Sequence, residues 1–159
     1  MVNFSRRANR KLIAYLLAHS PEGRVAEQDP EATRDAYHTL GTHPDIIGRL
    51  WDDFSAIMRR DCRWILYGRP VLVHPDTGVV FGFADGSLTY ALRLPPHEHA
   101  AAIRAGAHTV HHYPASPGIG AAASTLDLAD FGPEWIFGGW FEGEELWCMA
   151  AFNEAGKED

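Results

Sequence analysis

Residues 64–94 read WILYGRPVLVHPDTGVVFGFADGSLTYALRL, and this stretch decides the fold. Apolar runs rich in β-branched and aromatic residues alternate in it with turn signals at 74–78 and 84–87. Asp85-Gly86 between two such runs favours a hairpin, because both residues tolerate the positive φ that a tight turn requires. The stretch therefore predicts neighbouring antiparallel strands, a β-meander.

The alternation within residues 88–94 predicts how these strands face the interior. Leu88, Tyr90, Leu92 and Leu94 share one face, and the intervening residues share the other. We therefore expect one buried and one solvated face. Further strand candidates lie at 109–113, 126–128 and 135–137, so a sheet of about five strands is expected.

Helices are predicted before and after the meander along the chain. Apolar residues recur at helical spacing over 4–18 and, with the widest apolar stripe, over 44–59. Asp29-Pro30-Glu31 is typical of a helix start, which predicts a helix over 30–40. A short helix is expected over 96–105 and a terminal one over 144–155. Residues 1–159 should thus form a single α+β domain, its antiparallel meander covered by three N-terminal amphipathic helices and one C-terminal helix.

Composition excludes several classes of function. The chain has 159 residues, 46% of them hydrophobic, and a net charge of −7. This charge argues against general nucleic-acid binding, which depends on neutralising phosphates. No apolar run approaches the ~20 residues that span a bilayer, and no signal-peptide pattern is present. Because only Cys62 and Cys148 occur, we expect free thiols in a cytoplasmic protein.

Positive charge is concentrated at the start of the chain. Residues 1–19 carry four cations and no acid, whereas residues 121–159 carry nine acids and one lysine. Arg6 and Arg10 are four residues apart, as are Arg7 and Lys11, which places the four on a stripe of the predicted helix. Such a stripe is usually a solvated face, but it can also mark a partner site. We take Arg6, Arg7, Arg10 and Lys11 as candidate partner-binding residues.

Aromatic residues are concentrated near the end of the chain. Three of the five tryptophans, Trp135, Trp140 and Trp147, fall within thirteen residues. Tryptophan is frequent at interfaces, because it buries a large area and keeps one polar group. Packing of the sheet against the terminal helix would explain the same residues, and both interpretations are open at this point.

The nine histidines offer a different candidate site. His74, His108 and His112 could act as acid–base or ligand groups in a pocket between sheet and helices, because histidine titrates near neutral pH. Metal binding is not indicated. In a helix, His97 and His99 would point about 200° apart, and no His-Glu-x-x-His or Cys-x-x-Cys pattern occurs. We expect neither a metal nor a cofactor.

No local signature of catalysis was found. Residues 118–123 fit G-x-G-x-x-A, but a proline-containing turn precedes them where a dinucleotide site has a strand, so they are interpreted as a loop. Gly-x-Ser-x-Gly is absent. The leading hypothesis is a non-enzymatic protein-interaction or regulatory module with a protein partner. The alternative is a small-ligand-binding protein or an enzyme that uses the histidines.

A resemblance to a known family covers residues 63–114. The hairpins of 67–94, the helix that ends at Ala105-Gly106-Ala107, and then Tyr113-Pro114 follow one another in this order. The segment resembles the N-terminal domain of the TfoX/Sxy-like family. The resemblance implies a small cytosolic bacterial α+β domain tied to regulation, and it supplies no catalytic residue.

Overall fold

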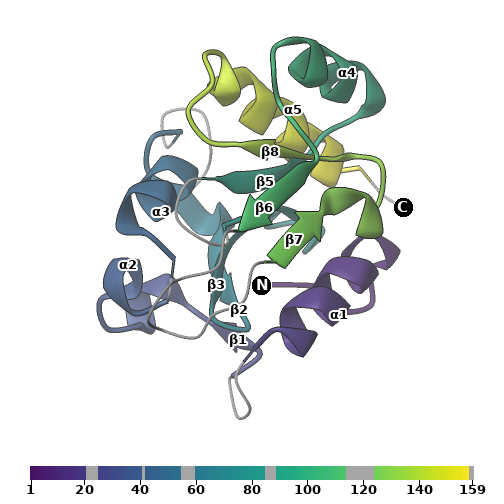
Figure 1. Ribbon diagram of the computed structural model, residues 1–159. Helices are drawn as coiled ribbons and strands as arrows, with labels where there is room; N and C mark the ends of the chain where they lie inside the picture. The colour runs from purple at the N-terminus through teal and green to yellow at the C-terminus, as the bar shows by residue number, and fades with distance from the viewer. Residues whose placement is uncertain (21–24, 41, 55–59, 85–88, 114–123, 158–159) are drawn as a thin grey trace.

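The computed structural model describes residues 1–20, 25–40, 42–54, 60–84, 89–113 and 124–157, arranged around an antiparallel sheet (Figure 1). The strand order is β1-β2-β3-β4-β5-β8. The strands of this sheet are β1 (Glu27–Gln28), β2 (Arg63–Leu66), β3 (Arg69–Val73), β4 (Val80–Ala84), β5 (Tyr90–Arg93) and β8 (Trp135–Gly138). A smaller sheet pairs β6 (Val110–Tyr113) with β7 (Ser124–Asp127). The α+β class and the antiparallel meander are confirmed, although the main sheet has six strands instead of about five.

The turns of the meander follow from residues that accept positive φ. Tyr67 and Gly68 connect β2 to β3 with φ of 46° and 76°, as a two-residue hairpin turn requires. Gly78, before β4, has φ of 71°, and a Cβ there would lie 2.6 Å from the Cβ of Asn3. Only glycine fits at this position without displacing the N-terminal segment. The predicted turn at 84–87 falls largely outside the described residues, but β4 and β5 pair antiparallel as it requires.

Both faces of the central sheet are buried, which corrects the expectation of one solvated face. Figure 1 shows α3 (Pro44–Trp51) and α1 (Arg10–Ala18) on opposite sides of the sheet. Helix α5 (Glu144–Ala155) shares the α3 side, and α4 (Pro96–Arg104) contacts α5. On the α1 side, β7 and the 3₁₀ turn Leu128–Asp130 complete the cover. No helix within the described ranges is both long and apolar enough to span a bilayer.

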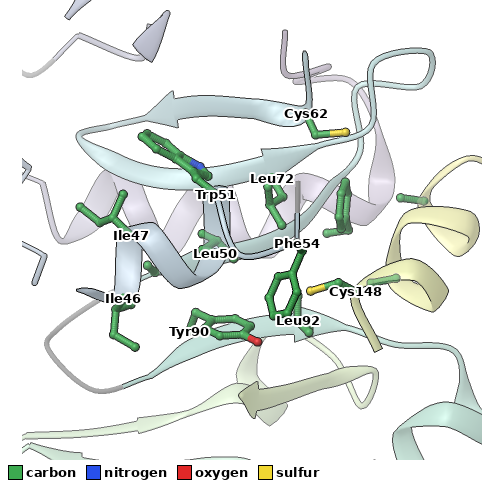
Figure 2. Packing of buried hydrophobic residues seen from close by; sticks show 14 of the residues in the cluster. Ile46, Ile47, Leu50, Trp51, Phe54, Cys62, Leu72, Tyr90, Leu92 and Cys148 are labelled. Carbon is green, nitrogen blue, oxygen red and sulfur yellow. The ribbon is translucent and has the colours of Figure 1, made fainter. Parts of the chain in front are cut away.

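Helix α3 makes the main contact on its face of the sheet. Ile46, Ile47, Leu50 and Trp51 are buried and face the strands (Figure 2). The indole N–H of Trp51 also donates to the carbonyl of Val71 at 3.0 Å. The helix is therefore held both by apolar burial and by a hydrogen bond to the sheet.

Three predicted helices are shorter or interrupted. The helix expected over 4–18 is a 3₁₀ turn, Arg7–Asn9, followed by α1. The helix expected over 30–40 is a 3₁₀ turn, Pro30–Ala32, then α2 (Ala36–Thr39), with Asp35 between them at φ of 51°. The carbonyl of Asp29 accepts a hydrogen bond from the hydroxyl of Thr33, and such local bonds compete with a continuous helix. Helix α3 ends at Trp51, and residues 55–59 of that prediction lie outside the described residues.

The helices predicted after the meander are confirmed. Helix α5 has the expected bounds, 144–155, and α4 begins at Pro96 and ends one residue before the predicted 105. Gly106, at φ of 110°, follows α4. Its conformation explains why the helix stops there, since glycine adopts positive φ at low cost.

One buried polar side chain, Asn9, ties the start of α1 to the β3–β4 hairpin. Its amide N–H₂ donates to the carbonyls of Asn3 and Gly78, both at 2.9 Å. Its side-chain oxygen accepts from the N–H of Val80 at 2.8 Å. The side chain is fully buried, and its hydrogen bonds to Gly78 and Val80 are buried as well. Asn9 thereby fixes where α1 begins.

We predict that Asn9→Ala lowers the free energy of unfolding by about 2–4 kcal/mol, because it removes three hydrogen bonds of a fully buried side chain, one of them to the buried N–H of Val80. Urea denaturation followed by circular dichroism measures this change. Asn153→Ala is the matched control, since Asn153 is exposed on α5 and its loss should change stability by less than about 0.5 kcal/mol. Equal effects of the two substitutions would contradict the assignment.

Candidate functional site

The four cations predicted to bind a partner line one hollow of about 830 Å³. Arg6, Arg7, Arg10 and Lys11 reach it from the 3₁₀ turn and the first turn of α1. Arg93, at the end of β5, and residues 131–134, just before β8, line it from the sheet. The structure therefore brings the predicted stripe together with one further arginine that the sequence analysis did not select. We call this hollow the basic hollow.

The basic hollow carries an excess of positive charge. Among the described residues that line it, Glu134 alone is acidic, and its Oε1 accepts a hydrogen bond from Nε of Arg93 at 3.3 Å. Arg7, Arg10 and Lys11 are exposed and form no ion pair with any described residue. Cations gathered on one surface without counter-charges repel one another and attract anions. The hollow therefore has the electrostatics of an anion-binding site.

Two of its arginines are held in place by the fold. Nε of Arg6 donates to the carbonyl of Thr77 at 3.2 Å, in the β3–β4 turn. Arg93 lies on the α1 face of the sheet, because the alternation along β5 places it on the same side as Ala91. Its partner Glu134 packs against Gly132, where an added Cβ would lie 2.6 Å from Oε2 of that carboxylate. Gly132 thus allows Glu134 to sit beside Arg93.

The basic hollow also has an apolar part, formed by Ala8, Phe131 and Pro133. The ring of Phe131 packs edge-on against those of Tyr15 and Phe83, with centroids 5.0 and 5.9 Å away. It is only 7% exposed, so it forms a fixed wall. A ligand that enters the hollow would meet apolar surface between the cations.

The structure does not bring the candidate histidines together. His74 is buried in the β3–β4 turn, where its Nδ1 accepts from the N–H of Asp76 at 3.2 Å and its ring packs against Phe152 of α5. His108 is exposed beside β8, with its ring centroid 5.4 Å from that of Phe137. Phe152 packs on the α3 face and Phe137 on the α1 face, so His74 and His108 lie on opposite faces of the sheet. His112 belongs to β6, and its side chain is outside what the structure describes.

A second hollow, of about 550 Å³, lies near β2. Its one cation, Arg63, donates to Glu31 at 2.8 Å and lies 3.6 Å from Asp52. Tyr37 also donates to Asp52, and burial, with this carboxylate, raises the pKa of its hydroxyl to about 12. Acidic side chains, Asp29, Glu31 and Asp61, outnumber the one cationic side chain among the residues that line this hollow, unlike in the basic hollow. In the ranges that the structure describes, no three His, Cys, Asp or Glu side chains cluster as metal ligands would.

The buried titratable groups between α3 and α5 form a structural tie. Glu144 is fully buried; its carboxylate accepts from Nη2 of Arg49 at 3.0 Å and from the N–H of Gly139 at 2.6 Å. Burial raises the pKa of the Cys148 thiol and of the Tyr90 hydroxyl well above their ordinary values. Both groups are therefore protonated at neutral pH. A buried, protonated thiol is a poor nucleophile, so Cys148 is part of the packing.

Comparison of the chain with models of protein families, with curated proteins and with solved structures found no match. The resemblance of residues 63–114 to the TfoX/Sxy-like domain thus stays a prediction.

We predict that neither cysteine of the folded protein reacts with Ellman's reagent within minutes at about pH 8, because the thiols of Cys62 and Cys148 are buried. Both should react at once in guanidinium chloride. The variant Cys62→Ala isolates Cys148 and should show one thiol, released only on unfolding. Fast labelling of Cys148 in this folded variant would show that the thiol is accessible.

Proposed function

We propose that this protein is a non-enzymatic interaction module that binds an acidic segment of a partner protein in the basic hollow. One observation carries the proposal: Arg7, Arg10 and Lys11, without ion pairs to described residues, gather in one hollow of a chain whose net charge is −7. Their mutual repulsion costs free energy that a bound anion would relieve. Arginine is frequent at the energetic centres of protein interfaces and binds carboxylates in a two-pronged geometry.

The dimensions and polarity of the basic hollow favour a short peptide segment over nucleic acid. A volume of about 830 Å³ holds a few side chains. Ala8, Phe131 and Pro133 offer apolar contact between the cations, which suits a segment that combines acidic and apolar residues. A nucleic acid would approach a molecule of net charge −7 against long-range repulsion.

The fixed arginines and the exposed cations would contribute differently to binding. Arg6 and Arg93 are held by Thr77 and Glu134, so they lose little conformational freedom when a ligand binds. Arg7, Arg10 and Lys11 are exposed and can adjust to different acidic segments. This combination supports a module that recognises charge and a short apolar anchor.

No comparable observation supports the alternative of a histidine-based enzyme or small-ligand binder, since His74 and His108 lie on opposite faces of the sheet. A cytoplasmic location belongs to the same proposal as the interaction module. It is supported by the two buried cysteines, which are not joined in a disulfide, as is usual in a reducing compartment.

Binding of a fluorescein-labelled hexaglutamate peptide, measured by fluorescence anisotropy at about 20 mM salt, tests the proposal. The double variant Arg7→Glu/Arg10→Glu should bind at least about tenfold more weakly, a loss of ~1.4 kcal/mol. Its melting temperature should stay unchanged, because both side chains are exposed. Arg104→Glu, a reversal of an exposed cation on α4, is the control and should bind like the parent protein.

Three results would contradict this proposal. They are no peptide binding at low salt, equal weakening by Arg104→Glu, and equally tight binding of a hexalysine peptide. Tighter binding of oligothymidylate than of hexaglutamate would show that the hollow prefers nucleic acid to an acidic protein segment. Raising the salt to about 0.5 M should abolish binding, because the attraction is electrostatic and exposed.

A further inference from the structure

The segment that follows β8 exposes apolar side chains among acids. Trp140 is 59% exposed and Leu146, in the first turn of α5, is 71% exposed. Glu142 and Glu145, between them in the chain, are also exposed. Scattered exposed apolar residues are ordinary, but an exposed tryptophan and an exposed leucine within one short segment that also carries exposed acids can mark an interaction surface. We call Trp140, Glu142, Glu145 and Leu146 the acidic-aromatic surface.

The ion pair between Arg49 and the buried Glu144 holds this segment in place. Nε of Arg49 donates to the carbonyl of Gly139 at 3.0 Å, and its guanidinium lies 5.3 Å from the centre of the Trp140 ring. Glu144 binds both Arg49 and the N–H of Gly139. The backbone next to Trp140 is therefore fixed before binding, which lowers the entropic cost of ordering this segment against a partner.

The acidic-aromatic surface and the basic hollow lie at different places on the molecule. Glu134 precedes β8 and Trp140 follows it, so that a strand of four residues, roughly 13 Å long, separates them. Arg93 lies on the α1 face of the sheet, whereas Glu144 and its partner Arg49 lie by the opposite face, with α3 and α5. None of the four residues of the acidic-aromatic surface lines the basic hollow of its own chain.

We propose that the acidic-aromatic surface of one molecule docks in the basic hollow of a second copy of this chain. Charge complementarity supports this occupant: two exposed carboxylates, Glu142 and Glu145, would face Arg7, Arg10 and Lys11. Polarity agrees as well, since Trp140 and Leu146 would meet the apolar part of the basic hollow. The inference rests on the proposed function and names the partner that supplies the acidic segment.

Such a contact joins two different surfaces, so each copy can bind one neighbour on either side. Head-to-tail contacts of this type give rings or open chains. A single hollow and one short segment make a small interface, so the association should be weak and salt-dependent. The protein should be monomeric when dilute and form larger species when concentrated.

Sedimentation velocity between about 10 and 500 µM tests this association. At about 20 mM salt the weight-average sedimentation coefficient should rise with concentration, and at about 0.5 M salt it should not. Trp140→Ala should weaken the self-association at unchanged charge. Arg104→Glu should leave it unchanged.

A charge exchange makes the test specific to the two surfaces. Glu142→Lys/Glu145→Lys and Arg7→Glu/Arg10→Glu/Lys11→Glu should each be monomeric alone, because hollow and surface then carry the same sign. Mixed together, they should associate, since each has a partner of opposite sign on the other. Circular dichroism melting of each variant establishes that it is folded.

The outcomes separate this inference from the proposed function. If hexaglutamate binds the hollow while the parent protein stays monomeric at low salt, the second copy is wrong as partner and the interaction module stands. If hexaglutamate does not bind, the proposed function itself fails. Self-association that survives both charge variants, or a mixture that does not associate, would overturn the docking of these two surfaces.

Discussion

The basic hollow depends on the buried amide of Asn9. This side chain joins the start of α1 to the carbonyl of Gly78 and the N–H of Val80, and the residues on either side of it in the chain carry the cations of the hollow. A continuous helix from residue 4 would turn these side chains differently. The placement of positive charge beside Arg93 is therefore a consequence of one hydrogen-bonded tie between distant parts of the chain.

The parts of the fold that follow from local chemistry could be predicted from the sequence. Turn residues such as Asp76 to Gly78 predict the meander, and Pro96 and Gly106 predict the extent of α4. The interrupted helix over 30–40 could not be predicted, because Asp35 adopts a left-handed conformation that the periodicity does not reveal. The cover on both faces was missed for another reason. Ala91 and Arg93 are compatible with a solvated face, and the positions of α1, β7 and the 3₁₀ turn at Leu128 make that face buried.

Part of the candidate site could likewise be predicted from the sequence, and part could not. The spacing of Arg6, Arg7, Arg10 and Lys11 places them together, because helical neighbours four residues apart share a face. Arg93 and Glu134 are more than eighty residues further along the chain, and no sequence pattern links them to α1. The acidic-aromatic surface was partly visible as a run of tryptophans. Which of them is exposed depends on packing. Trp135 is buried in the sheet, whereas Trp140 is exposed and its ring lies beside the guanidinium of Arg49.

The most direct test of the account is to map an acidic segment onto the folded chain. Titration of the ¹⁵N-labelled protein with unlabelled hexaglutamate, followed by heteronuclear NMR, reports which backbone amides change. The largest changes in amide chemical shift should fall at residues 5–11, at Arg93 and at 131–134. Shifts that centre on the second hollow near Arg63 or on the histidines, with residues 5–11 unaffected, would contradict it.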